Sequence, residues 1–208
     1  QARMVASVLD TLSADVVDLV ANDSGVAVAQ LFAALFPERV RTMLLTNGDV
    51  EPDCPPAGLL PVVDLAKAGR YAEEWLAPWA ADPALARSAQ GLGGMCYSLP
   101  GYPSDDGVAA YLAPLVSSPQ RKALTNAYAI ALERNALMGS EAALRNCQAP
   151  TRIVWGAADA IFSPNSPGYL DRILPQSRGV RWIETAKLFF PEEYPDVIAE
   201  EARALWGA

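Results

Sequence analysis

A carboxylate lies at the tightest turn that the sequence predicts, between a strand and a helix. The segment Ala21-Asn22-Asp23-Ser24-Gly25 has small residues at both ends and Asp23 in the middle. Small residues permit a sharp turn that raises the middle side chain above a sheet, where the helix N-terminus and the N–H of Ser24 stabilise negative charge. A carboxylate in that position can attack an sp³ carbon and form an ester. Aspartate also caps helices, so these residues alone leave both roles open for Asp23.

Histidine does not occur among the 208 residues. Its unperturbed pKa is the one that lies near neutrality, so Ser-His-Asp catalysis, Cys-His catalysis and histidine metal ligands are excluded. We expect no cofactor and no metal. Gly91–Gly94 has no strand before it and no GK[ST] after it, and Asp105-Asp106-Gly107 lacks the ligand spacing of a calcium loop and is more typical of a turn. Composition alone therefore disfavours hydrolysis.

Alternating strands and helices are predicted around Asp23. Val16–Asp23 is a short apolar run typical of a buried parallel strand, and helical spacing follows over Gly25–Phe36, where Pro37 ends it. Arg41–Gly48 predicts the next buried strand, which completes a βαβ unit. The alternation returns later as a strand with its turn over Thr151–Asp159, a helix over Gly168–Leu174, a strand over Arg178–Ala186 and a helix over Glu192–Trp206.

The other segments show helical spacing. Ala2–Ser13 places its apolar residues on one helix face, namely Met4, Val5, Val8, Leu9 and Leu12. Helices are also predicted over Leu59–Ala68, Tyr71–Trp79, Val108–Val116 and Lys122–Leu137, with loops at Gly91–Gly94 and Pro100–Gly107. The pattern therefore predicts an α/β core over residues 1–49 and 150–208, and a helical insertion over residues 50–149.

Three segments together resemble one enzyme family. VDLVANDSGVAVAQLFAALFPERVRTMLLTNGD is similar to the elbow region of α/β-hydrolases, closest to the haloalkane dehalogenase and epoxide hydrolase branch, where the pattern runs like LVGNDxGGxxAQxxAxxxPERVxxLxLTN. The resemblance returns at PTRIVWGAADAIFSP and at FFPEEYPDVIAEEARALW. It implies an α/β-hydrolase-like fold, with a partial parallel sheet of about four strands flanked by helices and with residues 50–149 as the helical cap.

The resemblance also implies roles for individual residues. Asp23 takes the position of the nucleophile, and Asp159 takes that of the acid that orients the catalytic base. Asp49 stands at the alternative acid position of some dehalogenases. Both acids are equally typical of turns and caps without the resemblance. Ser24 takes the oxyanion position through its N–H, and it stands where many haloalkane dehalogenases have a halide-binding tryptophan, which disfavours a dehalogenase.

The position of the catalytic base departs from the family. The resemblance implies a histidine just before FFPEE, and Leu188 stands there. Leucine cannot accept a proton, so an ester on the nucleophile would have no activated water to hydrolyse it. Lys187 would serve as a base only if burial lowered its pKa by several units from ~10.4. Glu184, Glu192 and Glu193 are weak bases, and the last two fit the acidic first turn of a helix.

The first strand of the pattern is expected at the edge of the sheet. The family has four further strands before the elbow strand, and this chain shows no such pattern before Val16–Asp23. An apolar edge strand invites pairing with another chain. We therefore expect either further residues upstream of Gln1 in the natural protein, or homo-oligomers that pair through Val16–Asp23.

Charge and cysteine content limit the binding partners and the cellular compartment that we expect for this protein. The formal net charge of −8 opposes binding to nucleic acids and to anionic membranes. No apolar run reaches the ~20 residues of a membrane span. Cys54, Cys96 and Cys147 are odd in number and far apart, which indicates reduced thiols in a cytoplasmic protein.

Three functions fit these observations. The first is a hydrolase for a small apolar molecule of haloalkane, epoxide or ester type, with Asp23 as nucleophile and Asp159 in support. The second is a non-catalytic descendant that binds an apolar ligand or serves in interactions. The third is non-hydrolytic chemistry, such as isomerisation, with Asp23 as acid or base. The aromatic residues of the cap either line a pocket or hold the cap to the core; they are Trp75, Trp79, Tyr97, Tyr102, Tyr111 and Tyr128.

Overall fold

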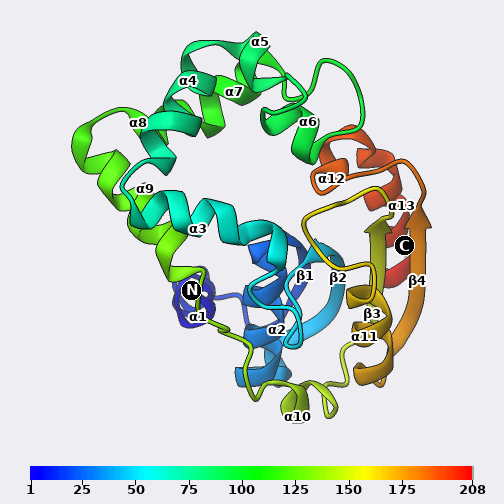
Figure 1. Cartoon of the computed structure of the whole chain (residues 1–208). Coiled ribbons are helices and arrows are strands. Elements are labelled where there is room, and N and C mark those ends of the chain that lie inside the picture. Colours follow the sequence, from blue (N-terminus) through cyan, green and yellow to red (C-terminus); the bar gives the residue numbers. More distant parts are fainter. Residues whose placement is uncertain (208) are drawn as a thin grey trace. The chain divides into compact units, whose positions relative to one another are not determined.

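The strands that the alternating pattern predicts form one four-stranded parallel sheet (Figure 1). The computed structural model describes residues 1–207, and the strands follow one another in the order β1-β2-β3-β4. They are β1 (Val17–Asp23), β2 (Val40–Gly48), β3 (Thr151–Gly156) and β4 (Ser177–Ile183). Parallel strands joined through helices make this an α/β fold, as expected.

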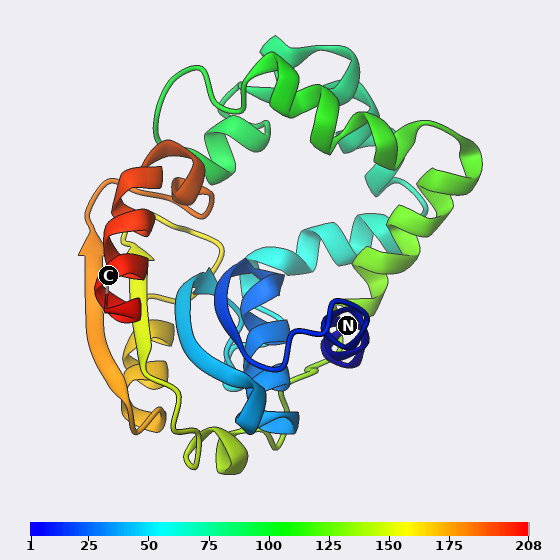
Figure 2. The ribbon, with the colours of Figure 1, turned by 180° about the vertical axis from the view of Figure 1, so that it is seen from behind.

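Helices connect and flank these strands. They are α1 (Ala2–Thr11), α2 (Ser24–Leu35), the 3₁₀ turn η1 (Pro37–Arg39), α10 (Glu141–Leu144), α11 (Ser166–Ile173), α12 (Phe190–Glu193) and α13 (Pro195–Trp206). Helix α2 packs on β1 and β2, and α13 packs on β2 and β3, as the view from behind shows (Figure 2). The core between α13 and the strands contains Leu44, Val154, Ala186, Phe190 and Ala202.

The chain forms two compact units. The first consists of Gln1–Cys54 and Ala136–Ala208 and contains the sheet, and the second consists of Pro55–Asn135. The second unit contains the 3₁₀ turn η2 (Ala57–Leu59), α3 (Leu60–Lys67), the π-helix η3 (Tyr71–Leu76), α4 (Ala77–Ala81), α5 (Pro83–Ala86), α6 (Leu92–Cys96), α7 (Asp105–Tyr111), α8 (Ala113–Val116) and α9 (Pro119–Ala131). No helix of residues 1–207 is long and apolar enough to cross a membrane.

Aromatic residues belong to the internal packing of the second unit. The rings of Trp75 and Trp79 lie 5.5 Å apart, and those of Tyr71 and Trp75 lie 6.1 Å apart. Trp79 is buried in a cluster with Leu76 and Val108. These tryptophans therefore hold the helices of this unit to one another.

Three local predictions were wrong. Gly91–Gly94 was expected in a loop, but α6 starts at Leu92, and a Cβ at Gly94 would lie 2.4 Å from the Ala89 backbone, so close packing requires the glycine. The turn expected at Asp105-Asp106-Gly107 is the first turn of α7, which Ser104 caps. The helix expected over Glu192–Trp206 is divided into α12 and α13, because Pro195 lacks the N–H that would continue α12.

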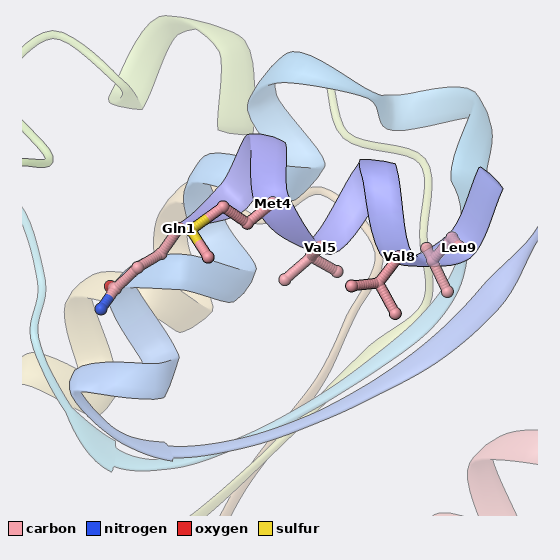
Figure 3. Close-up of a pocket in the computed structure, with 5 residues that line it drawn as sticks. All are labelled: Gln1, Met4, Val5, Val8 and Leu9. Atoms are coloured by element: carbon pink, nitrogen blue, oxygen red, sulfur yellow. The ribbon is translucent and has the colours of Figure 1, made fainter. Parts of the chain in front are cut away.

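Strand β1 lies at the edge of the sheet, as expected. Three residues of the apolar face predicted for α1 are exposed, namely Met4, Val8 and Leu12 at 68%, 56% and 70%, whereas Ala2 and Ala6 are buried. Figure 3 shows Val5, Val8 and Leu9 on the same side of α1, where they line an open pocket together with Gln1 and Met4. The pairing of two chains through β1 stays a prediction.

An ion-pair network ties α13 to β3 and β4. Glu201 accepts hydrogen bonds from Arg152 Nε at 2.6 Å and from Arg181 Nη1 at 2.8 Å, and its side chain is only 11% exposed. Burial alone would raise the pKa of Glu201, but the hydrogen bonds from both arginines outweigh burial and hold that pKa below 4.5.

We expect Glu201→Gln to lower the free energy of unfolding by about 1–3 kcal/mol, because it removes charge-assisted hydrogen bonds from two arginines. Since the folded pKa is lowered, this stabilisation is complete above pH 4.5 and is lost as the pH falls below it. Urea unfolding at pH 7 and pH 3 measures both effects. The neighbouring exposed Glu200 is the matched control, and Glu200→Gln should change stability by less than about 0.5 kcal/mol. Equal effects of the two substitutions would contradict the assignment.

Candidate active site

Asp23 lies at a strained turn between β1 and α2. Its backbone has φ 56° and ψ −135°, a conformation that costs a non-glycine residue about 1–3 kcal/mol. A Cβ on the paired residue Gly48 would lie 2.4 Å from the Asp23 carbonyl oxygen, so only glycine permits this approach. The Asp23 carboxylate accepts from the N–H of Ser24, the first residue of α2, but makes no capping hydrogen bond to the N–H groups further along the helix. Asp23 therefore does not act as a side-chain cap of α2, and its role as a nucleophile stays a prediction.

The environment of Asp23 raises the pKa of its carboxyl toward neutrality. Burial raises the pKa of Asp23 to about 6; the N–H of Ser24, which donates to the carboxylate, lowers it, and the negative charge of Asp159 raises it. At pH 7 the carboxylate form predominates. A carboxylate with a raised pKa is a stronger nucleophile than an ordinary aspartate at the same fraction ionised.

Asn22 joins the elbow to the segment that contains Leu188. Its Nδ2 donates to Thr46 Oγ1 at 2.7 Å and to the Leu188 carbonyl oxygen at 2.9 Å. The backbone at the expected base position therefore lies beside the residue that precedes Asp23. The Leu188 side chain is buried, at 3% exposure. Asn22 had no role predicted from the sequence, although an amide before the elbow acid was the available signal.

Asp159 is held in the turn after β3. Its Oδ2 accepts from Asn47 Nδ2 at 2.8 Å, and its Oδ1 accepts from the Ile161 N–H at 2.8 Å. Burial raises the pKa of Asp159, and these hydrogen bonds oppose the rise. The charge of Asp159 acts on Asp23, so the two acids share one electrostatic environment.

Asn47 is a site residue that the sequence analysis missed. It is fully buried near the end of β2, and it pairs with β3 in both directions: Gly156 N–H donates to Asn47 Oδ1 at 2.7 Å, and Asn47 Nδ2 donates to Gly156 O at 3.0 Å. An amide at the end of a strand predicted to be buried was the signal that could have found it. Asn47 thereby connects the ends of β2 and β3 to Asp159.

Asp49 is buried one residue beyond the end of β2. Gln30 Nε2 of α2 donates to its carbonyl oxygen at 2.7 Å, and the Cys54 thiol donates to its carboxylate. Burial and then the charge of Asp23 raise the pKa of Asp49 to about 6. Burial and the charge of Asp49 raise the pKa of the Cys54 thiol to about 11.

The structure thus brings Asp23, Ser24, Asp49, Asp159 and the backbone of Leu188 together at the carboxyl edge of the sheet. Four other residues were considered as the catalytic base. Glu184 and Glu192 are exposed, Glu193 is buried and Lys187 is half-buried. Residues 1–207 contain no group of acidic, cysteine or histidine side chains arranged to hold a metal ion.

The sequence matches no protein-family model and no curated protein. Solved structures of similar fold do match. MGS-M2, an α/β-hydrolase from a Medee basin deep-sea metagenome library, aligns over 100% of this chain and 71% of its own with 20% identity and a TM-score of 0.71. A thermophilic esterase from Thermogutta terrifontis aligns over 98% of this chain and 69% of its own, with 20% identity and a TM-score of 0.69.

A third similar structure is the 2-hydroxy-6-oxo-6-phenylhexa-2,4-dienoate hydrolase BphD of Rhodococcus sp. strain RHA1. It aligns over 100% of this chain and 69% of its own, with 15% identity and a TM-score of 0.75. At these identities the comparisons establish the fold alone, which is that of the α/β-hydrolases. The haloalkane dehalogenase and epoxide hydrolase branch stays a prediction.

Proposed function

We propose that this chain, which has an α/β-hydrolase fold, binds small apolar molecules with an electrophilic sp³ carbon and forms an ester between that carbon and Asp23. The observation that carries the proposal is the elbow itself. It holds a carboxylate in a strained backbone conformation, leaves α2 without a side-chain cap, and gives the acid a pKa of about 6.

The chemical step is a nucleophilic displacement. A carboxylate oxygen of Asp23 forms a bond to the carbon, and the carbon–halogen or ring carbon–oxygen bond breaks with its electron pair on the leaving atom. A halide then departs, whereas an epoxide oxygen must take up a proton. Hydrolysis of the ester needs an activated water, and Leu188 supplies no base for it. The ester should therefore persist.

Covalent labelling tests the proposal. After incubation with 1-bromohexane or 1,2-epoxyhexane, intact-mass spectrometry should show one added group, and peptide mapping should place it on Asp23. Asp23→Asn should abolish the adduct. Hydroxylamine should release it, because it cleaves esters and leaves thioethers intact, and Cys54→Ser should retain the labelling. An adduct only on cysteine, or equal labelling of the Asp23→Asn protein, would refute the proposal.

The pH dependence of labelling with 1-bromohexane follows from the pKa of Asp23. The deprotonated carboxylate is the nucleophile, so the rate should be constant above pH 7. It should be half its maximum near pH 6 and should fall about tenfold per pH unit at lower pH. An ordinary aspartate would remain at full rate down to about pH 5. A pH-independent rate between 5 and 7 would contradict the environment described for Asp23.

Ligand binding without chemistry is the second candidate, and the buried Leu188 at the base position favours it. In that case neither probe labels Asp23, while apolar ligands still raise the thermal unfolding temperature. We also propose a cytoplasmic location, because Cys54, Cys96 and Cys147 form no disulfide among the described residues.

A further inference from the structure

Asp49 is a buried carboxyl that takes no part in the displacement proposed for Asp23. It is 8% exposed, and it follows Gly48, the residue that pairs with Asp23 across β1 and β2. Three observations fix its position: Gln30 holds its carbonyl oxygen, Cys54 donates to its carboxylate, and its charge interacts with that of Asp23. Asp49 therefore lies beside the nucleophile and is separate from the contacts that hold Asp159.

The main chain of Asp49 is bound by a fully buried side chain of α2. Gln30 is fully buried; its Nε2 is engaged by the carbonyl oxygens of Val26 and Asp49, and its Oε1 has no hydrogen-bond partner among the described residues. The Gln30 contact therefore holds Asp49 where burial disfavours the charged form of its carboxyl.

The charged groups around the pair are also mostly acidic. Asp53 lies on the loop after β2, where its carboxylate accepts from the Ser163 N–H at 3.1 Å, and its charge acts on Asp49. Glu51 on the same loop accepts from the N–H groups of Gly139 at 2.7 Å and Glu141 at 2.9 Å. Asp159 faces Asp23 from the turn after β3. The basic residue of the segment before α12 is Lys187, which is half-buried.

Two adjacent carboxyls in such a site do not ionise independently. Each charge disfavours the other, so the pair loses its two protons in separate steps and carries one proton over the pH range between them. Burial raises the pKa of both acids to about 6, and the charge of Asp23 adds to the rise at Asp49. Near pH 6 the site therefore offers a carboxylate and a carboxylic acid side by side.

We propose that Asp49 is the proton donor of this site, which protonates the ring oxygen of an epoxide as Asp23 attacks the ring carbon. This inference rests on the proposed function. The Asp23 oxygen–carbon bond forms, the ring carbon–oxygen bond breaks with its electron pair on oxygen, and that oxygen takes the proton of Asp49. The products are a hydroxyalkyl ester on Asp23 and a carboxylate on Asp49. A bromoalkane needs no such proton, because bromide leaves as the anion.

Labelling with the two probes between pH 4.5 and 8 tests this inference. With 1,2-epoxyhexane the wild-type rate should pass through a maximum near pH 6, because Asp23 must be ionised and Asp49 protonated. With 1-bromohexane the rate should only rise with pH. Asp49→Asn should slow labelling by the epoxide by about 10²-fold and remove the decline at high pH. The same substitution should leave the maximal rate with the bromoalkane within about threefold and move its midpoint to lower pH, because a neighbouring charge is removed.

Controls separate this role from a structural one. Asp49→Glu keeps the acid and should keep a maximum in the epoxide profile. Asp53→Asn removes a charge that raises the pKa of Asp49, so it should keep the epoxide maximum, move the decline on its high-pH side to slightly lower pH and leave the maximal rates with both probes unchanged. Equal slowing of labelling by both probes in the Asp49→Asn protein would overturn the inference. A labelling rate of the wild-type protein by the epoxide that does not decline above pH 6 would also overturn it, and that measurement does not depend on the folding of any variant. Labelling by the bromoalkane alone refutes Asp49 as the donor and leaves the proposed function standing. Labelling by neither probe refutes both.

Discussion

Leu188→His is expected to convert a persistent alkyl ester on Asp23 into one that water hydrolyses. The backbone of Leu188 is tied to the elbow through the 2.9 Å hydrogen bond from Asn22. An imidazole at position 188 would therefore extend from backbone that lies close to the ester. Asp159 already interacts electrostatically with Asp23 and retains lone pairs for a further donor. A positioned general base contributes about 10²–10⁴-fold, and we expect an acceleration of ester hydrolysis in that range.

The measurement is the decay of the Asp23 adduct after removal of excess 1-bromohexane, followed by intact mass. The decay rate of the Leu188→His protein should rise with pH through about 6.5, the pKa of an unperturbed imidazole. Leu188→Asn is the matched control, because it places a polar side chain of similar length without a base at the same position. If the ester decays equally fast in the histidine and asparagine variants, water access and not base catalysis limits hydrolysis.

Asn47→Ala is expected to cause the largest loss of stability among the site substitutions, about 3–5 kcal/mol. The side chain is fully buried and makes hydrogen bonds with Gly156 N, Gly156 O and Asp159 Oδ2. Alanine leaves the two backbone groups of Gly156 without these partners in the centre of the sheet, and each such group costs about 1–3 kcal/mol. This is a large fraction of the about 5–15 kcal/mol that stabilises a typical domain.

Chemical unfolding followed by circular dichroism measures this loss. Asn146→Ala is the control, since the exposed Asn146 side chain donates only to the Ala142 carbonyl of its own helical segment, at 2.9 Å. We expect a change of less than about 1 kcal/mol there. Similar effects of the two substitutions would show that the Asn47 network contributes no more than a surface hydrogen bond.

The order of strands and the position of the elbow were predictable because both depend on local sequence. Buried parallel strands are apolar and β-branched, and a sharp strand-to-helix turn requires small residues, so β1, β2 and the turn at Asp23 could be located within about two residues. The parallel four-stranded sheet followed from the alternation of strands with helices.

The contacts that complete the site were not predictable, because they join residues far apart in the chain. Asn22 meets Leu188 across 166 positions, and Asn47 meets Gly156 across 109. Neither pairing leaves a periodic pattern in the sequence. The same limit applies to α1, where the apolar spacing predicted a helix correctly but did not reveal that Met4 and Val8 would be exposed.

The two ends of the inserted second unit meet at one residue. The N–H groups of Ala136 and Leu137, where the chain re-enters the first unit, donate to the sulfur of Cys54, where the chain leaves it. An insertion whose entry and exit points are adjacent adds little constraint to its host, because a loop of almost any length can span so short a gap. The acids of the candidate site all lie in the host unit. A change in the length of Pro55–Asn135 therefore need not move the acids at the carboxyl edge of the sheet.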